Sequence, residues 1–283
     1  MNKNESITDI LHKSGKRALG GGISGASAMV LQVGSLMWLR TTMNYQYRYG
    51  TPMKESFLKL YKEGGIRRFY RGVGPALIQG PLSRFGDTAA NAGIISVLDS
   101  YPTSKKLPIF IKTACSSCVA GLWRIVLMPV DTVKTILQVE GRNGLSILNQ
   151  KYKTNGIRVF YQGSIVACSA TFVGHYPWFY TYNYLSENLP IKESFYGNLC
   201  RNAVIGFSSS VVSDCSSNSL RILKTVKQSS NNNLSYPDSV KLVVSKDGIY
   251  GLFFRGIQTR ILANGLQGIL FTIAFKAIQE KFN

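Results

Sequence analysis

Hydrophobic and polar positions alternate along this chain in long blocks rather than in short periods. Two blocks carry no Asp, Glu, Lys or Arg: 21 residues from Leu19 to Leu39 and 24 residues from Gly163 to Ser186. Such runs are typical of membrane-spanning helices, although buried helices of a soluble protein can also produce them. Weaker blocks, each with at least one charge, occur at 73–99, 107–137, 197–226 and 256–278. The pattern predicts an all-α membrane protein with six transmembrane helices.

A glycine-containing phrase recurs three times between these blocks. The phrases occupy residues 65–72, 156–163 and 248–256, and their closing glycines lie 91 and 93 residues apart. A unit of this length is too long for a solenoid repeat, so it is a folded module used three times. We therefore divide the single membrane domain into repeats at residues 17–104, 105–194 and 195–283.

Each repeat places a basic amphipathic segment before its glycine phrase. The segments are Pro52–Lys62, Leu145–Lys153 and Pro237–Lys246, in which apolar residues interleave with lysines. Segments of this kind are typical of helices that lie in the membrane interface. We expect three short amphipathic helices on one side of the membrane.

The net charge of +19 is distributed unevenly between the two sides of the predicted bundle. Nucleic-acid binding is the usual first interpretation of such a charge, but the basic residues form no stripe with interleaved aromatics. The loops 44–72, 139–163 and 227–256 carry fifteen Lys or Arg, whereas the N-terminus and the other loops carry about seven. The positive-inside tendency places these three loops on the cytosol-equivalent side and both termini on the opposite side. We expect membrane lipids, and no nucleic acid, as partners.

Residues that usually carry catalysis or bind metals form no recognisable constellation. Cys115 and Cys118 make a C-x-x-C pair, but a zinc site needs four ligands and the chain has only two histidines. The sequence shows neither a nucleophile–base pair at meaningful spacing nor a phosphate-cradling Gly-Lys loop. The first eighteen residues lack the apolar region of a secretory signal. We predict no enzymatic activity, no cofactor and no metal site.

The segment Pro129–Gln138 carries the most specific pattern in the chain. Its proline, Asp131, Lys134 and Gln138 are spaced 2, 3 and 4 apart. With the three glycine phrases, it resembles the mitochondrial carrier family, whose signature Pro-x-[Asp/Glu]-x-x-[Lys/Arg] ends each odd-numbered helix. The resemblance covers about residues 17–280. It implies six tilted helices around a pseudo-threefold axis in the mitochondrial inner membrane, three short matrix helices, a central cavity between two gates, and both termini in the intermembrane space.

The resemblance implies a matrix gate built as a ring of salt bridges, from which this chain departs. Repeat one has neither acid nor base at the gate positions, and its Arg40 falls one position late, about 100° around the helix. Repeat three has Arg221 in place of the acid and retains the base as Lys224. Only Asp131 and Lys224 can form the expected link, and Lys134 and Arg221 are the other charged residues of this gate.

The opposite gate of the family has lost its ionic lock in this chain. The equivalent positions near Ala92, in Tyr182–Ser186 and in Phe275–Gln279 lack the acid–base pairs of the family pattern. Tyr182 and Phe275 remain as side chains that could close the opening sterically.

The family also places substrate contacts seven or eight residues after each closing glycine. The corresponding positions here are Gln79, Gly80, Ala170, Thr171, Ala263 and Asn264. None is charged, and because a buried anion demands a paired cation, this argues against a typical nucleotide or dicarboxylate site.

Charged residues do occur slightly further along the even-numbered helices. Arg84 and Asp87 lie three apart on one helix face, and His175 occupies the position equivalent to Arg84 in repeat two. One interpretation is a polar cluster that orients a zwitterion or an amino-acid-like solute. The other is a structural ion pair beside a histidine whose hydrogen bonds are satisfied.

Two functional hypotheses follow from the resemblance. The first is a solute carrier that works by alternating access. The second, prompted by the lost gate charges, is a transport-deficient protein with the carrier fold that serves as an accessory subunit of a larger inner-membrane complex. Under either, we expect anionic lipids such as cardiolipin at the helix N-termini after Gly72, Gly163 and Gly256, beside Arg71 and Arg255.

Overall fold

The computed structural model describes residues 7–191, 194–230 and 234–282, and every regular element in these ranges is a helix. Six long helical segments account for most of the chain. They are α1 (Ile7–Tyr49), α3 (Val73–Ser100), α5 (Ile109–Val126) followed by α6 (Met128–Glu140), α8 (Ser164–Asn188), α9 (Phe195–Ser229) and α11 (Ile257–Phe282). The expected all-α class is confirmed.

Shorter helices fill the connections. They are α2 (Met53–Phe69), α4 (Pro102–Lys105), α7 (Gly144–Asn155), α10 (Tyr236–Phe254) and the 3₁₀ turns η1 (Gly141–Asn143) and η2 (Gly156–Tyr161). The three predicted amphipathic segments lie in α2, α7 and α10. They are helical, as expected.

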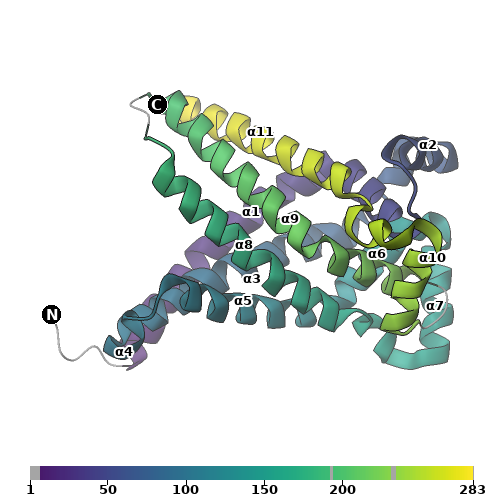
Figure 1. Cartoon of the computed structure of the whole chain (residues 1–283), viewed down its shortest axis with the longest axis horizontal. Coiled ribbons are helices and arrows are strands. Elements are labelled where there is room, and N and C mark those ends of the chain that lie inside the picture. Colours follow the sequence, from purple (N-terminus) through teal and green to yellow (C-terminus); the bar gives the residue numbers. More distant parts are fainter. Residues whose placement is uncertain (1–6, 192–193, 231–233, 283) are drawn as a thin grey trace.

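The long helices are spread apart at one end of the molecule and draw together at the other (Figure 1). Both chain ends lie at the spread end, which we call the splayed end. The opposite, convergent end carries α2, α6, α7 and α10. A buried cluster there joins Tyr47 of α1, Ile222 and Val226 of α9 and Val243 of α10, so the core at this end is built from different repeats.

The closing glycine of each recurring phrase has a left-handed backbone conformation. It directly precedes the second long helix of its repeat, which is α3, α8 or α11. The φ angles are +83° at Gly72, +84° at Gly163 and +66° at Gly256. Glycine adopts this region without the steric cost that a Cβ atom brings. The phrase recurs because the chain must make the same turn into α3, α8 and α11.

The first long helix of repeat one and that of repeat two bend in different ways. In repeat two, Pro129 stands at the start of α6, and α5 ends at Val126. Repeat one has no proline at the equivalent position, yet α1 is kinked at Leu36 (φ −113°, ψ 15°). The Tyr70 hydroxyl donates a hydrogen bond of 3.2 Å to the Gly34 carbonyl beside this kink. A side-chain donor therefore accompanies the bend where the proline is missing.

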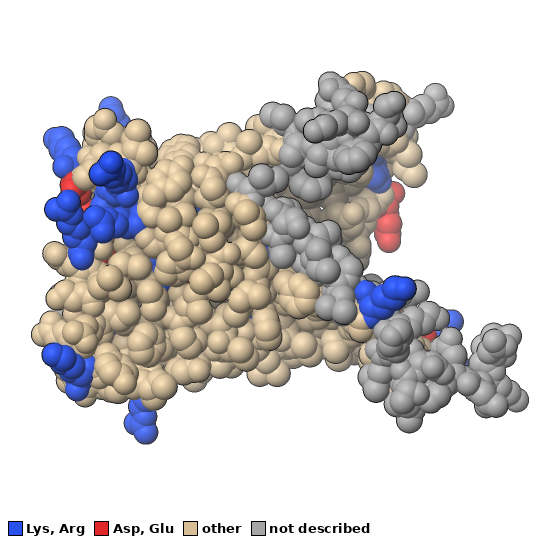
Figure 2. All heavy atoms as spheres, turned by 180° about the vertical axis from the view of Figure 1, so that it is seen from behind, with Lys and Arg blue, Asp and Glu red and all other residues tan. Residues whose placement is uncertain are grey.

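By length and hydropathy, no helix in the described ranges qualifies on its own as a membrane span. The segments Phe110–Val126 and Met128–Asn188, which meet at an angle of 67°, qualify together. Lys and Arg side chains gather at the convergent end in Figure 2, and a broad band without them covers the middle of that face.

Candidate functional site

The predicted link between repeats two and three is present at the convergent end. Asp131, in the first turn of α6, is buried and forms an ion pair with Lys224 of α9. Lys134 Nζ lies 2.8 Å from the same carboxylate. Gln228 Nε2 donates to Thr132 Oγ1 at 3.0 Å, which adds a second contact between the two helices. One acid thus holds two lysines, so this network keeps a net positive charge.

The six predicted substrate-contact positions do not form one polar surface. Gly80, Ala170 and Ala263 are buried, and the Thr171 hydroxyl donates to the Ala167 carbonyl of its own helix. Two of the six reach charged groups. Gln79 Oε1 accepts a 2.7 Å hydrogen bond from Lys134, and Asn264 donates to Asp214. These two amides connect the predicted contact positions to the interior charges.

A second charged centre lies around Asp214 of α9, which the sequence had not singled out. Arg260 Nε of α11 lies 2.5 Å from the Asp214 carboxylate. The Tyr47 hydroxyl accepts a hydrogen bond from Arg260 and donates one of 2.9 Å to Asn218 Oδ1. The sequence did contain a signal of this centre, namely charged residues inside the apolar blocks 197–226 and 256–278. Charges in a membrane helix usually pair or face a cavity.

Asp87 has a different partner from the one predicted. Arg124 of α5 lies 2.5 Å from its carboxylate, whereas Arg84 is exposed. The approach of the two helices explains the choice. A Cβ on Gly86 would lie 1.9 Å from the Trp123 ring, and Trp123 Nε1 donates to the Leu82 carbonyl at 2.8 Å. Because α3 and α5 meet so closely at Gly86, Arg124, which follows Trp123, reaches Asp87, which follows Gly86.

His175 does not join that ion pair by a hydrogen bond. Its Nδ1 lies 3.1 Å from Ser117 Oγ of α5. The predicted cluster of Arg84, Asp87 and His175 is therefore replaced by two separate contacts between helices, Asp87 with Arg124 and His175 with Ser117. This arrangement fits the structural interpretation of these residues.

Arg40 of α1 and Arg221 of α9 each lie within electrostatic range of Arg124 of α5 and Arg260 of α11. Arg221 is also within range of the Asp214 carboxylate, and Arg40 of the exposed Arg84. The interior is therefore strongly basic.

The predicted lipid-binding positions have a structural role between repeats. A Cβ on Gly72 would lie 3.1 Å from the Lys134 carbonyl of α6, one on Gly163 would lie 3.4 Å from Lys224 of α9, and one on Gly256 would lie 2.8 Å from the Tyr47 ring of α1. Each closing glycine thus packs against the first long helix of another repeat. A Cβ at Gly72 or Gly256 would crowd that helix or side chain, whereas at Gly163 the cost comes from the left-handed backbone alone.

Arg255 lies inside the protein. It is buried, and its Nε lies 2.6 Å from Asp247 while Nη1 donates to the Tyr47 carbonyl. The lipid-facing role predicted for Arg255 therefore does not fit its position, because the guanidinium is used inside the protein. Arg71 is partly exposed.

Two further cations bind the C-terminal ends of α6 and α9. Arg68 donates to the carbonyls of Gln138 and Val139, at 2.9 and 2.7 Å. Lys151 Nζ of α7 donates to the Gln228 carbonyl at 2.9 Å, and burial lowers the pKa of this lysine to about 8. Together with Arg255, which binds the end of α1, these residues place one cation from each repeat at the C-terminal end of the first long helix of the next repeat. The helix dipole is negative at that end.

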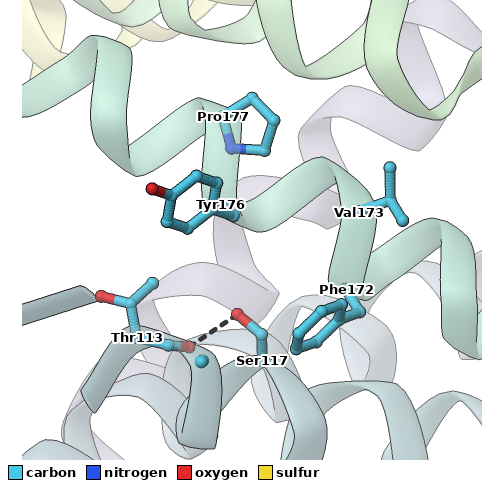
Figure 3. A pocket seen from close by; sticks show the side chains of 7 residues that line it. Thr113, Ser117, Phe172, Val173, Tyr176 and Pro177 are labelled. Atoms are coloured by element: carbon cyan, nitrogen blue, oxygen red, sulfur yellow. Dashed lines mark hydrogen bonds between the residues drawn. The ribbon is translucent and has the colours of Figure 1, made fainter. Parts of the chain in front are cut away.

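An apolar cavity of about 340 Å³ lies between α5 and α8 (Figure 3). Phe172, Val173 and Tyr176 line it from α8, and Thr113 and Ser117 line it from α5. The Ser117 hydroxyl is already bonded to the Thr113 carbonyl at 2.7 Å. The cavity offers little for recognising a polar solute, so we place the candidate site in the charged interior.

Comparison with known proteins supports the carrier resemblance. The family model "Mitochondrial carrier protein" matches residues 12–101 and 105–193. A maize protein, "Mitochondrial carrier protein CoAc1" of Zea mays, is 34% identical over 91 residues. That alignment covers 32% of this chain and 26% of the maize protein, so the similarity spans about a quarter of that relative.

Proposed function

Since this chain belongs to the mitochondrial carrier family, a family of transporters rather than enzymes, we propose that it carries a solute across the mitochondrial inner membrane by alternating access. The six long helices cross the bilayer. The convergent end faces the matrix, and both termini face the intermembrane space. The basic loops at the convergent end support this orientation, because Lys and Arg concentrate on the side from which membrane proteins insert.

The observation that carries the proposal is the ion pair between Asp131 and Lys224. It joins two repeats at the convergent end, while the helices stand apart at the other end (Figure 1). A contact present in only one of two states is what biases an alternating equilibrium. We assign this pair to the state that is closed toward the matrix, and it must break when that end opens.

Uptake into liposomes by the purified protein tests the proposal. Wild-type protein should exchange or accumulate at least one solute from a panel of anions, zwitterions, cations and sugars. Asp131→Asn should reduce that uptake at least tenfold, because Lys134 and Lys224 would then face each other without an acid. Asp238→Asn removes an acid from an exposed position on α10 and should leave uptake nearly unchanged.

Absence of uptake for every solute, in protein shown by circular dichroism to be helical, would contradict the proposal. The accessory-subunit hypothesis would then gain support if the protein comigrated with a large complex after mild extraction from membranes. One observation favours that hypothesis: among the described residues, no ion pair crosses the interior at the splayed end.

A further inference from the structure

Each recurring phrase opens, as it closes, with a glycine in a left-handed conformation. The φ angles are +59° at Gly65, +61° at Gly156 and +67° at Gly248. A Cβ on any of these three would meet no atom of the described chain within 4 Å, apart from its neighbours in the chain. Only the backbone conformation therefore favours glycine at these sites, which we call the opening turns.

Each opening turn presents an isoleucine on the outside of the protein. Ile66, Ile157 and Ile249 are 70%, 69% and 67% exposed. A single exposed apolar residue on a protein surface is ordinary. Three isoleucines that follow equivalent glycines and have nearly equal exposure are a property of the repeat. They indicate a partner that meets each repeat in the same way.

The opening turns lie at the same point of their repeats. They bend α2 and α10 after the amphipathic segment, and in repeat two the turn separates α7 from η2. The convergent end carries all three amphipathic helices (Figure 1). A partner in contact with all three turns must offer the same apolar surface around this end. The surface of a bilayer does so, whereas a protein subunit docked on one side would cover only one of them.

The residues around two of the opening turns suit the boundary between lipid headgroups and acyl chains. Arg67 and Arg158, both exposed, follow directly after the isoleucines of repeats one and two. An exposed tyrosine lies five residues before each of these isoleucines, at Tyr61 and Tyr152. Tyrosine is enriched at membrane–water interfaces, and arginine near a membrane surface is attracted to anionic headgroups.

The opening turn of repeat three has a larger apolar surface and lacks the arginine. Its phrase is one residue longer, and Tyr250 follows Ile249 where the other two repeats have arginine. Tyr250 is 78% exposed, and Phe253 and Phe254 are also exposed. This turn therefore offers apolar contact without an arginine beside it.

We infer that Ile66, Ile157 and Ile249 insert into the membrane surface at the convergent end and anchor that end to the bilayer at three points. Arg67 and Arg158 bind anionic lipid headgroups beside two of the anchors, and the third anchor binds by apolar contact alone. This inference rests on the membrane location in the proposed function, but not on transport. It concerns other residues than the helix N-termini after the closing glycines.

Fluorescence quenching of the full chain in liposomes tests the anchors. Single-cysteine variants Ile66→Cys, Ile157→Cys and Ile249→Cys, with the five native cysteines changed to serine, each carry a small environment-sensitive fluorophore. Phospholipids brominated on their acyl chains should quench all three labels, and iodide in water should quench them little. The reason is that apolar side chains of interfacial segments lie about 5–10 Å into the boundary between headgroups and acyl chains.

Two further labels serve as controls in preparations of wild-type helicity. Glu55→Cys replaces an exposed acid of α2, and its label should be quenched by iodide. Leu122→Cys replaces an exposed leucine of α5, and its label should be quenched by the brominated lipids. A label at any of the three isoleucines that iodide quenches like the Glu55 label would overturn the three-point anchor. A label shielded from both quenchers would also overturn it, because a protein would then cover that turn.

The charge of the brominated lipid separates the three anchors. Brominated phosphatidylglycerol should quench the labels at Ile66 and Ile157 more than brominated phosphatidylcholine does, whereas the label at Ile249 should show no preference. Arg67→Gln should lower the preference at Ile66 by up to about fivefold and leave that at Ile157 unchanged. An equal preference at all three labels, or one that Arg67→Gln does not alter, would overturn the role of the arginines.

Uptake by the same liposomes separates this inference from the proposed function. Uptake of a solute together with iodide-quenched labels at the isoleucines would overturn the anchors and leave transport intact. Lipid-quenched labels without uptake of any solute would support the anchors and contradict transport. A Leu122 label quenched by iodide would contradict the membrane location and overturn the inference with it.

Discussion

The two ends of this bundle are held together by different kinds of contact. At the convergent end, side chains of one repeat bind the helices of another, as Asp131 does with Lys224 and Arg68 with the carbonyl of Gln138. At the splayed end, contacts join helices that follow each other in the chain. Lys112 of α5 lies 2.5 Å from Asp99 of α3, and Arg201 of α9 donates to the Leu189 carbonyl after α8.

This difference indicates where the molecule can change shape. The contacts at the splayed end also join two repeats, but across a short connection that already holds the two helix ends together. The contacts at the convergent end join segments far apart in the chain, and they must break or rearrange when that end opens. The convergent end therefore holds the interactions that decide which state is populated. At the splayed end, the Tyr182 ring stacks on Trp178 of the same helix, with ring centroids 5.0 Å apart.

Removing an inter-repeat cation should have the largest effect on stability. Arg68→Met leaves two carbonyls at the end of α6 without their donor, and we expect a loss of about 2 kcal/mol. Arg67→Met is the matched control at the neighbouring exposed position and should cost less than about 0.5 kcal/mol. Chemical denaturation in detergent measures both, and equal losses for the two variants would contradict the role given to Arg68.

A side chain at a closing glycine should have the next largest effect. Gly163→Ala places a Cβ at φ +84° and 3.4 Å from Lys224, so we expect a loss of about 1–2 kcal/mol. Gly74→Ala serves as the control, because this glycine is helical and has open space around it. Its substitution should stabilise the protein by up to about 1 kcal/mol. A neutral Gly163→Ala would show that the turn tolerates other conformations.

The ion pair at the splayed end should matter less. Lys112→Met breaks its contact with the half-exposed Asp99, and we expect about 1 kcal/mol or less of destabilisation. Transport should stay within about twofold of wild type, since this pair joins two helices that a short connection already holds together. A tenfold loss of uptake would mean that the splayed end is itself an ionic gate.

Lys151 predicts a small dependence of stability on pH. Burial and the nearby charges of Arg48 and Lys227 lower its pKa to about 8 in the folded protein, below the value near 10.5 expected on unfolding. Between these values the unfolded chain binds more protons, so folding becomes more favourable as pH rises. Relative to Lys151→Met, the wild type should gain about 1 kcal/mol from pH 9 to pH 10. A parallel pH profile for the two proteins would contradict this.

Much of the architecture was predictable because it depends on local pattern. The apolar blocks gave the long helices, and the spacing of glycines gave the turns at Gly72, Gly163 and Gly256. The link between Asp131 and Lys224 was also predictable, because the resemblance to the carrier family pairs the acid of one repeat with the base of the next.

The remaining contacts depend on how closely particular helices approach. Asp87 pairs with Arg124 because Gly86 leaves room for the Trp123 ring. The spacing of Arg84 and Asp87 in the sequence does not indicate this close approach of α3 and α5. Arg255 was predicted to face lipid because it adjoins a helix N-terminus. Asp247, eight residues earlier, instead draws it inward.

The distance between α2 and α10 across the convergent end tests the account most directly. Spin labels at Lys54 and Lys241, both exposed, in a background with the five cysteines replaced by serine, report this distance by pulsed electron paramagnetic resonance. Wild-type protein should show mainly the shorter distance, and Asp131→Asn should shift the distribution toward a longer one. An unchanged distribution in the folded variant would contradict the claim that the Asp131 network holds this end closed.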